Sequence, residues 1–281
     1  MSRDSLKNTF LVAGILCVVC SLLVSSTYVG LKDRQEENKQ RDKKLNILEA
    51  CGLDKETTDI DHVYANNVSA RLVDLNSGQY IDHWQEGSGA DDYDLDQLFE
   101  DKSRYKELTR QEDLPGIEKR ENIVAVYIYT EGDSQRIVLP VRGKGLWSTL
   151  WGFVAVDSTG SMINGITFYE HGETPGLGGE VDNVNWKELW KSGKQIYDDD
   201  GSVKVKVLKK GTPQTDVNSQ VDGLAGATIT TNGVSKLLEF WLGDLGFKKF
   251  LTNKPWLENG DQPNPQSVTA QDIDTSQDGE K

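Results

Sequence analysis

The chain contains few of the residues that build metal centres and disulfide frameworks. Three cysteines and three histidines are scattered over its 281 residues. These numbers exclude a zinc finger, an iron–sulfur cluster and a disulfide-stabilised fold, so no metal site is predicted. Cys17 and Cys20 lie in an apolar segment, where a thiol does not ionise easily, and Cys51 is isolated. We interpret the first two as small apolar residues.

The sequence also lacks the common catalytic and nucleotide-binding motifs. It contains no G-x-x-x-x-G-K-[ST], G-x-G-x-x-G, G-x-S-x-G or H-E-x-x-H segment. His62, His83 and His171 are far apart, and no nucleophile stands beside them in the sequence. Hydrolase chemistry is therefore unsupported, and no residue is predicted to act as a catalytic acid or base.

Positive charge is scarce. The chain has 31 Lys+Arg against 45 Asp+Glu, a net charge of −14. A chain this acidic repels phosphate backbones, which argues against nucleic-acid binding. A composition of 36% hydrophobic, 27% charged and 8% aromatic residues is that of a globular protein. The length allows no more than two ordinary domains.

One long apolar segment stands near the N-terminus. Residues 8–31 carry no charge, and as a helix they would extend about 36 Å, enough to cross a hydrocarbon core of about 30 Å. A cleaved signal peptide is the alternative, because Val24, Ser25 and Ser26 are small residues near a possible cleavage site. Apolar character resumes at residues 28–31, which favours a retained transmembrane helix.

The charges around this segment do not settle its orientation. Two bases precede it, and residues 32–41 contain four bases interleaved with three acidic residues. The excess of bases after the segment favours a cytoplasmic domain, but long domains are translocated largely regardless of charge. The charges therefore do not decide on which side of the membrane the domain lies.

The remaining sequence mixes strand and helix patterns without β-α-β alternation, which predicts an α+β fold: one N-terminal transmembrane helix, then a mixed, largely antiparallel sheet with flanking helices. We divide it into a helical stalk or linker (32–58), a globular domain (59–253) and a disordered tail (254–281). Strands are expected at residues 68–75, 79–81, 123–129, 135–141, 163–169 and 203–208.

Two helices are expected from the spacing of apolar residues. Val234, Leu237, Leu238, Trp241 and Leu245 follow the period of an amphipathic helix. Trp186 and Trp190 stand four residues apart on a short helix, where packing is the favoured interpretation.

Residues 86–121 form an acidic insertion with 12 acidic and six basic residues, which we interpret as a helical or loose surface segment. Within it, Asp92, Asp94 and Asp96 have the spacing that begins an EF-hand loop. Gln97 and Ser103 occupy the positions that need glycine and glutamate, so a solvated acidic surface is the preferred interpretation.

Two glycine-rich segments remain. Residues 222–228, D-G-L-A-G-A-T, lead directly into the amphipathic helix, where free backbone N–H groups favour a phosphate group. Simple capping of the helix is the alternative. Residues 171–179, H-G-E-T-P-G-L-G-G, follow a strand and suit either a tight loop against a flat ligand or an ordinary turn.

Both segments resemble signatures of the FMN-binding domain family. The D-G-x-x-G-A-T element resembles that family's flavin-attachment motif, although Ala225 stands where the family usually has Ser or Thr, and residues 173–178 resemble its second signature. The resemblance implies that FMN is bound covalently to Thr228 through a phosphoester. It also implies flavin contacts at Asp222, Gly226, Ala227, Glu173, Thr174, Gly176, Leu177 and Trp147.

Within that family, residues 143–149 resemble the C-type members, which belong to sodium-translocating NADH:quinone reductases, and the resemblance covers residues 8 to about 250. It implies an electron-carrying component of a six-subunit pump in the bacterial inner membrane, which oxidises NADH, reduces ubiquinone and exports Na⁺. The domain would face the periplasm, NADH and quinone would bind other subunits, and a flavin transferase would attach the FMN. The alternatives are the G-type flavoprotein of the Rnf complex and a membrane-anchored binding module without a redox role.

Overall fold

A computed structural model describes residues 6–53 and 59–258, which form two units, one up to Lys43 and one from Lys44 onward. The first unit consists of the greater part of helix α1 (Leu6–Ala50). The most apolar window of this helix is not buried by other parts of the structure. A core helix of a soluble domain would bury such a window, so α1 is a candidate membrane span.

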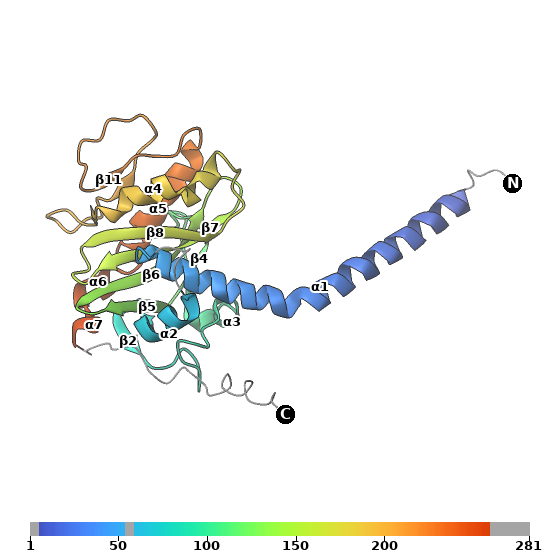
Figure 1. The fold of residues 1–281 in the computed structure, drawn as a ribbon, viewed down its shortest axis with the longest axis horizontal. Helices are drawn as coiled ribbons and strands as arrows, with labels where there is room; N and C mark the ends of the chain where they lie inside the picture. The colour runs from blue at the N-terminus through green and yellow to red at the C-terminus, as the bar shows by residue number, and fades with distance from the viewer. Residues whose placement is uncertain (1–5, 54–58, 259–281) are drawn as a thin grey trace, which may run out of the picture. The chain divides into compact units, whose positions relative to one another are not determined.

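The second unit is built on an antiparallel sheet (Figure 1). Among the described residues the sheet has seven strands in the order β2-β1-β5-β6-β7-β8-β9, and every neighbouring pair is antiparallel. This confirms the predicted fold class. The strands are β1 (Val68–Asp74), β2 (Gln79–Ile81), β5 (Ile123–Glu131), β6 (Ser134–Lys144), β7 (Thr149–Asp157), β8 (Met162–Glu170) and β9 (Lys194–Gln195).

Two small sheets and several helices complete this unit. β3 (Tyr105–Glu107) pairs with β4 (Lys119–Glu121), and β10 (Lys206–Val207) pairs in parallel with β11 (Gln220–Val221). The expected strand at 203–208 is thus reduced to two residues. The helices are α2 (Ile60–Asn67), α3 (Leu95–Leu98), α4 (Val184–Lys191), α5 (Thr228–Trp241), α6 (Lys248–Asn253) and α7 (Pro255–Glu258), with 3-10 turns η1 (Lys102–Arg104) and η2 (Gly178–Asp182).

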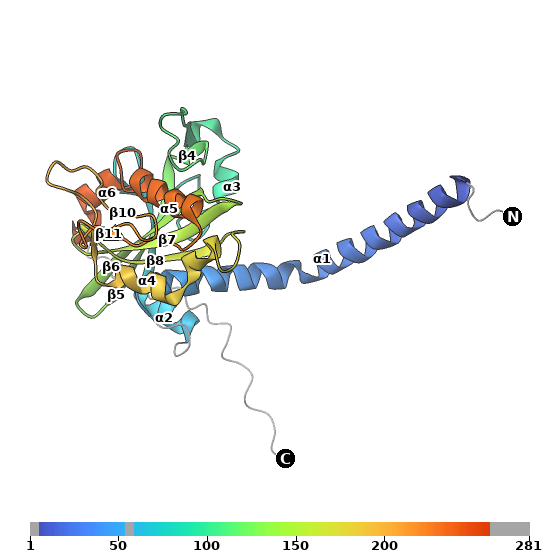
Figure 2. The same ribbon diagram turned by 90° about the horizontal axis from the view of Figure 1, so that it is seen from above.

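Both faces of the sheet are buried. Along β5, Val126 and Ile128 belong to one apolar cluster, while Tyr127 and Tyr129 belong to another on the opposite face. Figure 2 shows α5 and α6 on one side of the sheet and α2 on the other. Strands covered on both faces lose the polar alternation of a half-exposed strand, which explains the continuous apolar runs in the sequence.

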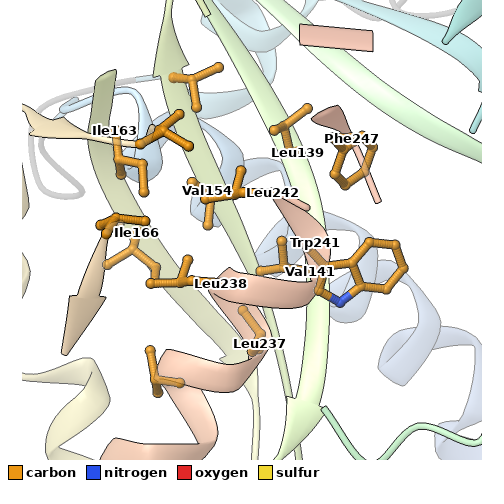
Figure 3. Close-up of a cluster of buried hydrophobic side chains, with 14 of the residues drawn as sticks. Leu139, Val141, Val154, Ile163, Ile166, Leu237, Leu238, Trp241, Leu242 and Phe247 are labelled. Carbon is orange, nitrogen blue, oxygen red and sulfur yellow. The ribbon is translucent and has the colours of Figure 1, made fainter. Parts of the chain in front are cut away.

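Helix α5 contributes most to the larger cluster (Figure 3). Its buried face carries Val234, Leu237, Leu238 and Trp241, as the apolar spacing predicted, and Leu245 lies beyond the end of the helix. Fully burying each such side chain contributes about 1.5–3 kcal/mol. The expected short helix is also present as α4, where the two tryptophan rings meet edge to face with centroids 5.6 Å apart.

The opposite face is covered partly by the C-terminal end of α1, contrary to the predicted stalk. Ile47, Leu48, Ala50 and Cys51 are buried in the second cluster. The Thr167 hydroxyl donates a hydrogen bond to the backbone carbonyl of Asn46 at 3.1 Å. The globular domain therefore begins before residue 59. In the predicted stalk, apolar residues are interspersed with many charged ones. This pattern fits both a solvated stalk and a helix end with one buried face, so the sequence did not distinguish the two.

The acidic insertion is folded, which corrects the expectation of a helical or loose segment. β3 and β4 pair within it, and Leu98 and Tyr105 join Trp84 in a third apolar cluster. The Asp94 side chain accepts hydrogen bonds from the first backbone N–H groups of α3, so this member of the calcium-like triad caps a helix.

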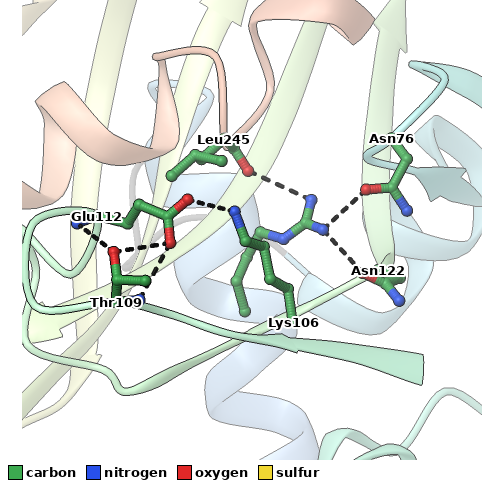
Figure 4. Close-up of polar contacts among 7 residues, drawn as sticks. Asn76, Lys106, Thr109, Glu112, Asn122 and Leu245 are labelled. Carbon is green, nitrogen blue, oxygen red and sulfur yellow. Dashed lines mark hydrogen bonds and ion pairs between the residues drawn. The ribbon is translucent and has the colours of Figure 1, made fainter. Parts of the chain in front are cut away.

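Polar contacts attach the insertion to the rest of the domain (Figure 4). The Arg120 guanidinium donates to Asn76 Oδ1 at 2.9 Å, to Asn122 Oδ1 at 2.8 Å and to the Leu245 carbonyl at 3.4 Å. Glu121 forms a buried two-pronged ion pair with Arg142 of β6, with both N–O distances 2.6 Å. Removing one partner from such a pair costs about 3–5 kcal/mol, because the other charge is left buried alone.

The C-terminal boundary also differs from the prediction. Residues 255–258 form α7, and Trp256 is only 1% exposed, with its indole N–H donating to the Ser158 carbonyl at 3.0 Å. Residues 255–258 are therefore folded, although the prediction placed them in the disordered tail. Residues 259–281 lie outside the described part of the chain.

Candidate functional site

Thr228 is the first residue of α5, and its side chain is exposed. The residue before it, Ala227, has no side-chain hydrogen bond that caps the helix within the described structure. The backbone N–H of Thr231 donates to the Ala227 carbonyl at 2.9 Å, which closes the first turn of the helix. A helix start without a side-chain cap can receive an anionic group on its first N–H groups.

The two neighbouring threonines have a different environment. Thr230 and Thr231 are each only 1% exposed. The Thr230 hydroxyl donates to Glu173 Oε2 at 2.6 Å, and the Thr231 hydroxyl accepts the backbone N–H of Leu224 at 3.1 Å. Both hydroxyls therefore hold loops in place, and Thr228 has the accessible hydroxyl among the three.

Glu173 connects three segments of the site. Its carboxylate accepts backbone N–H groups from Leu146 at 3.1 Å, Trp147 at 2.8 Å and Ser148 at 3.2 Å. It also accepts the Thr230 hydroxyl. Glu173 is 5% exposed. Through these hydrogen bonds its carboxylate connects the β6–β7 loop and α5 to its own loop.

These contacts explain why the buried carboxylate is ionised. Burial alone would raise the pKa of Glu173, because it disfavours the charged form. The Thr230 hydroxyl and the three backbone N–H groups outweigh burial and hold the pKa of Glu173 below its usual range. The loop is thus built around an ionised carboxylate.

Two glycines allow these segments to approach one another. A Cβ atom on Gly178 would lie 2.6 Å from both Glu173 Oε2 and Thr230 Oγ1, so a side chain there would break the network. Gly226 has a φ of +70°, and a Cβ on it would lie 2.9 Å from Leu177 Cδ2. The loop before α5 and the Glu173 loop are therefore in contact at Leu177.

The segments that meet here expose apolar side chains. Trp147 is 68% exposed although its backbone N–H is bound by Glu173. Leu146, Leu177 and Ile229 are also exposed large hydrophobic residues, each on a segment of the same network. Exposed apolar side chains beside an uncapped helix start suit a ligand with a flat apolar part and an anionic group.

The remaining predicted residues lie at the edges of this site. Asp222 forms an ion pair with Lys210, and its backbone carbonyl accepts the Trp186 indole N–H at 2.9 Å. The Thr174 carbonyl accepts backbone N–H groups from residues 177 and 179. Thr174 and Gly176 are exposed. The two bonds to the Thr174 carbonyl shape the turn of the Glu173 loop.

The local sequence predicts no individual role for Ser148, His171 or Asp182. The Ser148 hydroxyl accepts the Gly172 N–H at 2.6 Å, and His171 Nε2 lies 2.7 Å from Asp182 Oδ2. No short pattern marks these pairs, because their partners are 24 and 11 residues apart. Within residues 6–53 and 59–258, no group of three or more His, Cys, Asp or Glu is placed to hold a metal ion.

Comparison with known proteins places these residues in a family context. Residues 145–243 match the model of the FMN-binding domain, a range that contains the β6–β7 loop, Glu173 and Thr228. The C-type component of the Na(+)-translocating NADH-quinone reductase from Vibrio parahaemolyticus is 41% identical over 251 residues, covering 89% of this chain and 95% of the relative. The corresponding protein from Pseudomonas aeruginosa is 42% identical over 258 residues, covering 90% and 97%.

Solved structures agree with these relatives. A crystal structure of Shewanella oneidensis NqrC matches with a TM-score of 0.67 and 31% identity, covering 77% of this chain and 98% of that one. The corresponding protein from Parabacteroides distasonis matches with a TM-score of 0.62 and 28% identity, covering 79% and 97%. The chain therefore belongs to the NqrC family, the C-type components of the Na(+)-translocating NADH-quinone reductases, which are oxidoreductase complexes, and it contains the FMN-binding domain.

Proposed function

We propose that Thr228 carries FMN through a phosphoester bond to its side-chain oxygen. The observation that carries the proposal is the contrast among three nearby hydroxyls: Thr228 is exposed, whereas Thr230 and Thr231 are buried and bound to other segments. The position of Thr228 at an uncapped helix start also favours a phosphate group.

The surrounding residues would hold the flavin without reacting with it. Gly226 and Ala227 leave the backbone before α5 without bulky side chains. Trp147 and Leu177 present exposed apolar surface from the two loops that Glu173 and Gly226 bring together. When bound, the flavin supplies the electron transfer, and the protein supplies its attachment and surroundings. Glu173, Thr174, Gly176 and Asp222 shape these loops.

In the complex, this protein would relay electrons from NADH toward ubiquinone, coupled to Na⁺ export. The chain would have no complete active site of its own, so NADH and quinone would bind the other members of the six-subunit complex. The domain after α1 would face the periplasm, since a domain of this size can be translocated against local charge bias. A flavin transferase would attach the FMN.

The test is to produce the full chain together with its flavin transferase and to run a denaturing gel under ultraviolet light. Covalent flavin stays fluorescent on the band, and peptide mass spectrometry should place the added mass on Thr228. Flavin on Thr230 or Thr231, or an unmodified chain, would contradict the proposal.

Orientation needs a separate measurement. A reporter that is active only in the periplasm, fused after Gly260, should be active. Activity from a cytoplasmic reporter alone would place the domain on the opposite side and refute the periplasmic assignment.

A further inference from the structure

His171 lies between strand β8 and the Glu173 loop and contacts both the loop and η2. Its Nε2 atom lies 2.7 Å from Asp182 Oδ2, at the end of η2. Its Nδ1 atom lies 3.2 Å from the backbone nitrogen of Glu173. The side chain of His171 is 13% exposed and that of Asp182 is 47% exposed.

These two contacts determine where the imidazole carries its proton. A backbone N–H can only donate, so Nδ1 of His171 must be an unprotonated acceptor for Glu173. The proton of the neutral ring is then on Nε2, where it is donated to the Asp182 carboxylate. The geometry corresponds to a neutral imidazole in its Nε2–H form.

The Glu173 backbone that His171 holds belongs to the residue at the centre of the site. The Glu173 carboxylate binds the N–H groups of residues 146–148 and the Thr230 hydroxyl. The neighbouring Gly172 N–H is held by the Ser148 hydroxyl at 2.6 Å. Through Glu173, the His171 contact is therefore connected to the loop that carries Trp147 and to the start of α5.

We propose that His171 is a proton-sensitive positioning residue for the flavin loop. The neutral ring accepts the Glu173 N–H and holds the loop as described. A proton on Nδ1 removes that acceptor and places two N–H groups against each other, so the ring and the loop cannot keep this arrangement. The link to flavin rests on the proposed function, whereas the proton-dependent movement of the loop does not.

The charges around the ring favour proton uptake. Asp182, from η2, and Glu173, from the loop itself, are the charged groups that act on the ring. The hydrogen bond to Asp182 and the negative charge of both carboxylates outweigh burial and raise the pKa of His171 above its ordinary value. The protonated ring keeps its contact with Asp182 and loses the one with Glu173.

The experiment is a pH titration of the full chain in detergent micelles by nuclear magnetic resonance, with ¹⁵N-labelled histidine and backbone amides. At high pH the His171 signals should show the Nε2–H form. As the pH falls, the amide signals of residues 146–148 and of Glu173 should shift with the same midpoint as the His171 ring. The absorption spectrum of attached flavin should shift with that midpoint too.

Three variants separate this role from a purely structural one. His171→Asn keeps an acceptor oxygen near the position of Nδ1 but does not titrate, so the amide shifts should be lost and the loop signals should stay near their high-pH positions. Asp182→Asn removes the carboxylate charge, so the midpoint should move to lower pH. His83→Asn, at an exposed histidine, is the matched control and should leave the titration unchanged.

Two results would overturn the proposal: an Nδ1–H form at high pH, or loop amides that do not follow the His171 titration. A chain that is produced with its flavin transferase and carries no flavin, but whose loop amides still follow the titration, would support the proposal and contradict the proposed function instead. The two conclusions therefore fail in distinguishable ways.

Discussion

The loop after β8 and the segment 222–228, which ends at the first residue of α5, both combine glycine with threonine, but they direct their polar groups in opposite ways. The first loop turns Glu173 inward, where four donors bind the carboxylate. The second loop ends at Thr228, whose hydroxyl is exposed. In the first loop the carboxylate is hydrogen-bonded within the protein, whereas the second loop leaves a hydroxyl accessible for reaction.

This difference shows how one hydroxyl can be selected from a cluster. Thr228, Thr230 and Thr231 lie within four residues, and local sequence makes them chemically alike. Folding uses two of them for loop contacts and leaves the third accessible. Substitutions in each loop can test this division of roles.

The largest expected effect is the loss of flavin from the second loop. Thr228→Ala should abolish covalent flavin and in-gel fluorescence, while the free energy of unfolding should change by no more than about 0.5 kcal/mol, because an exposed side chain is shortened. Thr228→Ser keeps an alcohol at the same place and is the matched control. A fluorescent band from the alanine variant would contradict the assignment.

Substitution of Glu173 in the first loop should mainly lower the free energy of unfolding. Glu173→Ala would leave three backbone N–H groups and a buried hydroxyl without their acceptor, at about 1–3 kcal/mol for each donor that water cannot reach. Urea denaturation of the full chain should show a large loss, and Glu173→Gln, which keeps one acceptor oxygen, a smaller one. Equal stability of Glu173→Ala and the parent chain would show that the network has no energetic role.

Thr230→Val should have an intermediate effect. It removes the donor to Glu173 while keeping the size of the side chain, so we expect a loss of about 1–2 kcal/mol in the free energy of unfolding. Flavin should stay attached at Thr228. A variant that folds but lacks covalent flavin would indicate that Thr230 takes part in attachment.

Ionisation of Glu173 should contribute to the pH dependence of the free energy of unfolding. Its pKa is lowered in the folded state, so its contribution is fully present above the unfolded pKa of about 4.3 and is lost as the pH falls through the folded value. The free energy of unfolding, measured by urea denaturation at a series of pH values, should fall as the pH is lowered through this window. Glu173→Gln should reduce that fall. The same slope in both proteins would assign it to other carboxyl groups.

Trp147→Ala, like Thr228→Ala, should have little effect on stability. The side chain is 68% exposed, so the free energy of unfolding should change by no more than about 0.5 kcal/mol. If Trp147 packs near the flavin, the fluorescence of the attached flavin should change, because a nearby indole no longer quenches it. An unchanged flavin spectrum would place the ring elsewhere.

Several features could be predicted because their determinants are local. The spacing of Val234, Leu237, Leu238 and Trp241 predicted α5, and β-branched runs separated by turns predicted β5, β6 and β8. The candidate attachment residue also follows from a short contiguous motif ending at Thr228. Each signal lies within a dozen or so residues, where backbone preference and side-chain period act directly.

The remaining features depend on partners distant in sequence. The sequence by itself determined the apolar N-terminal helix, the main strands and α5, and the motif at Thr228. Only the tertiary structure decided that the end of α1 covers one face of the sheet, and that Glu121 pairs with Arg142. It also decided that Thr230 binds Glu173, 57 residues away, and that His171 binds Asp182. Burial and hydrogen bonding at each position depend on which segments meet there, and a local pattern does not contain that information.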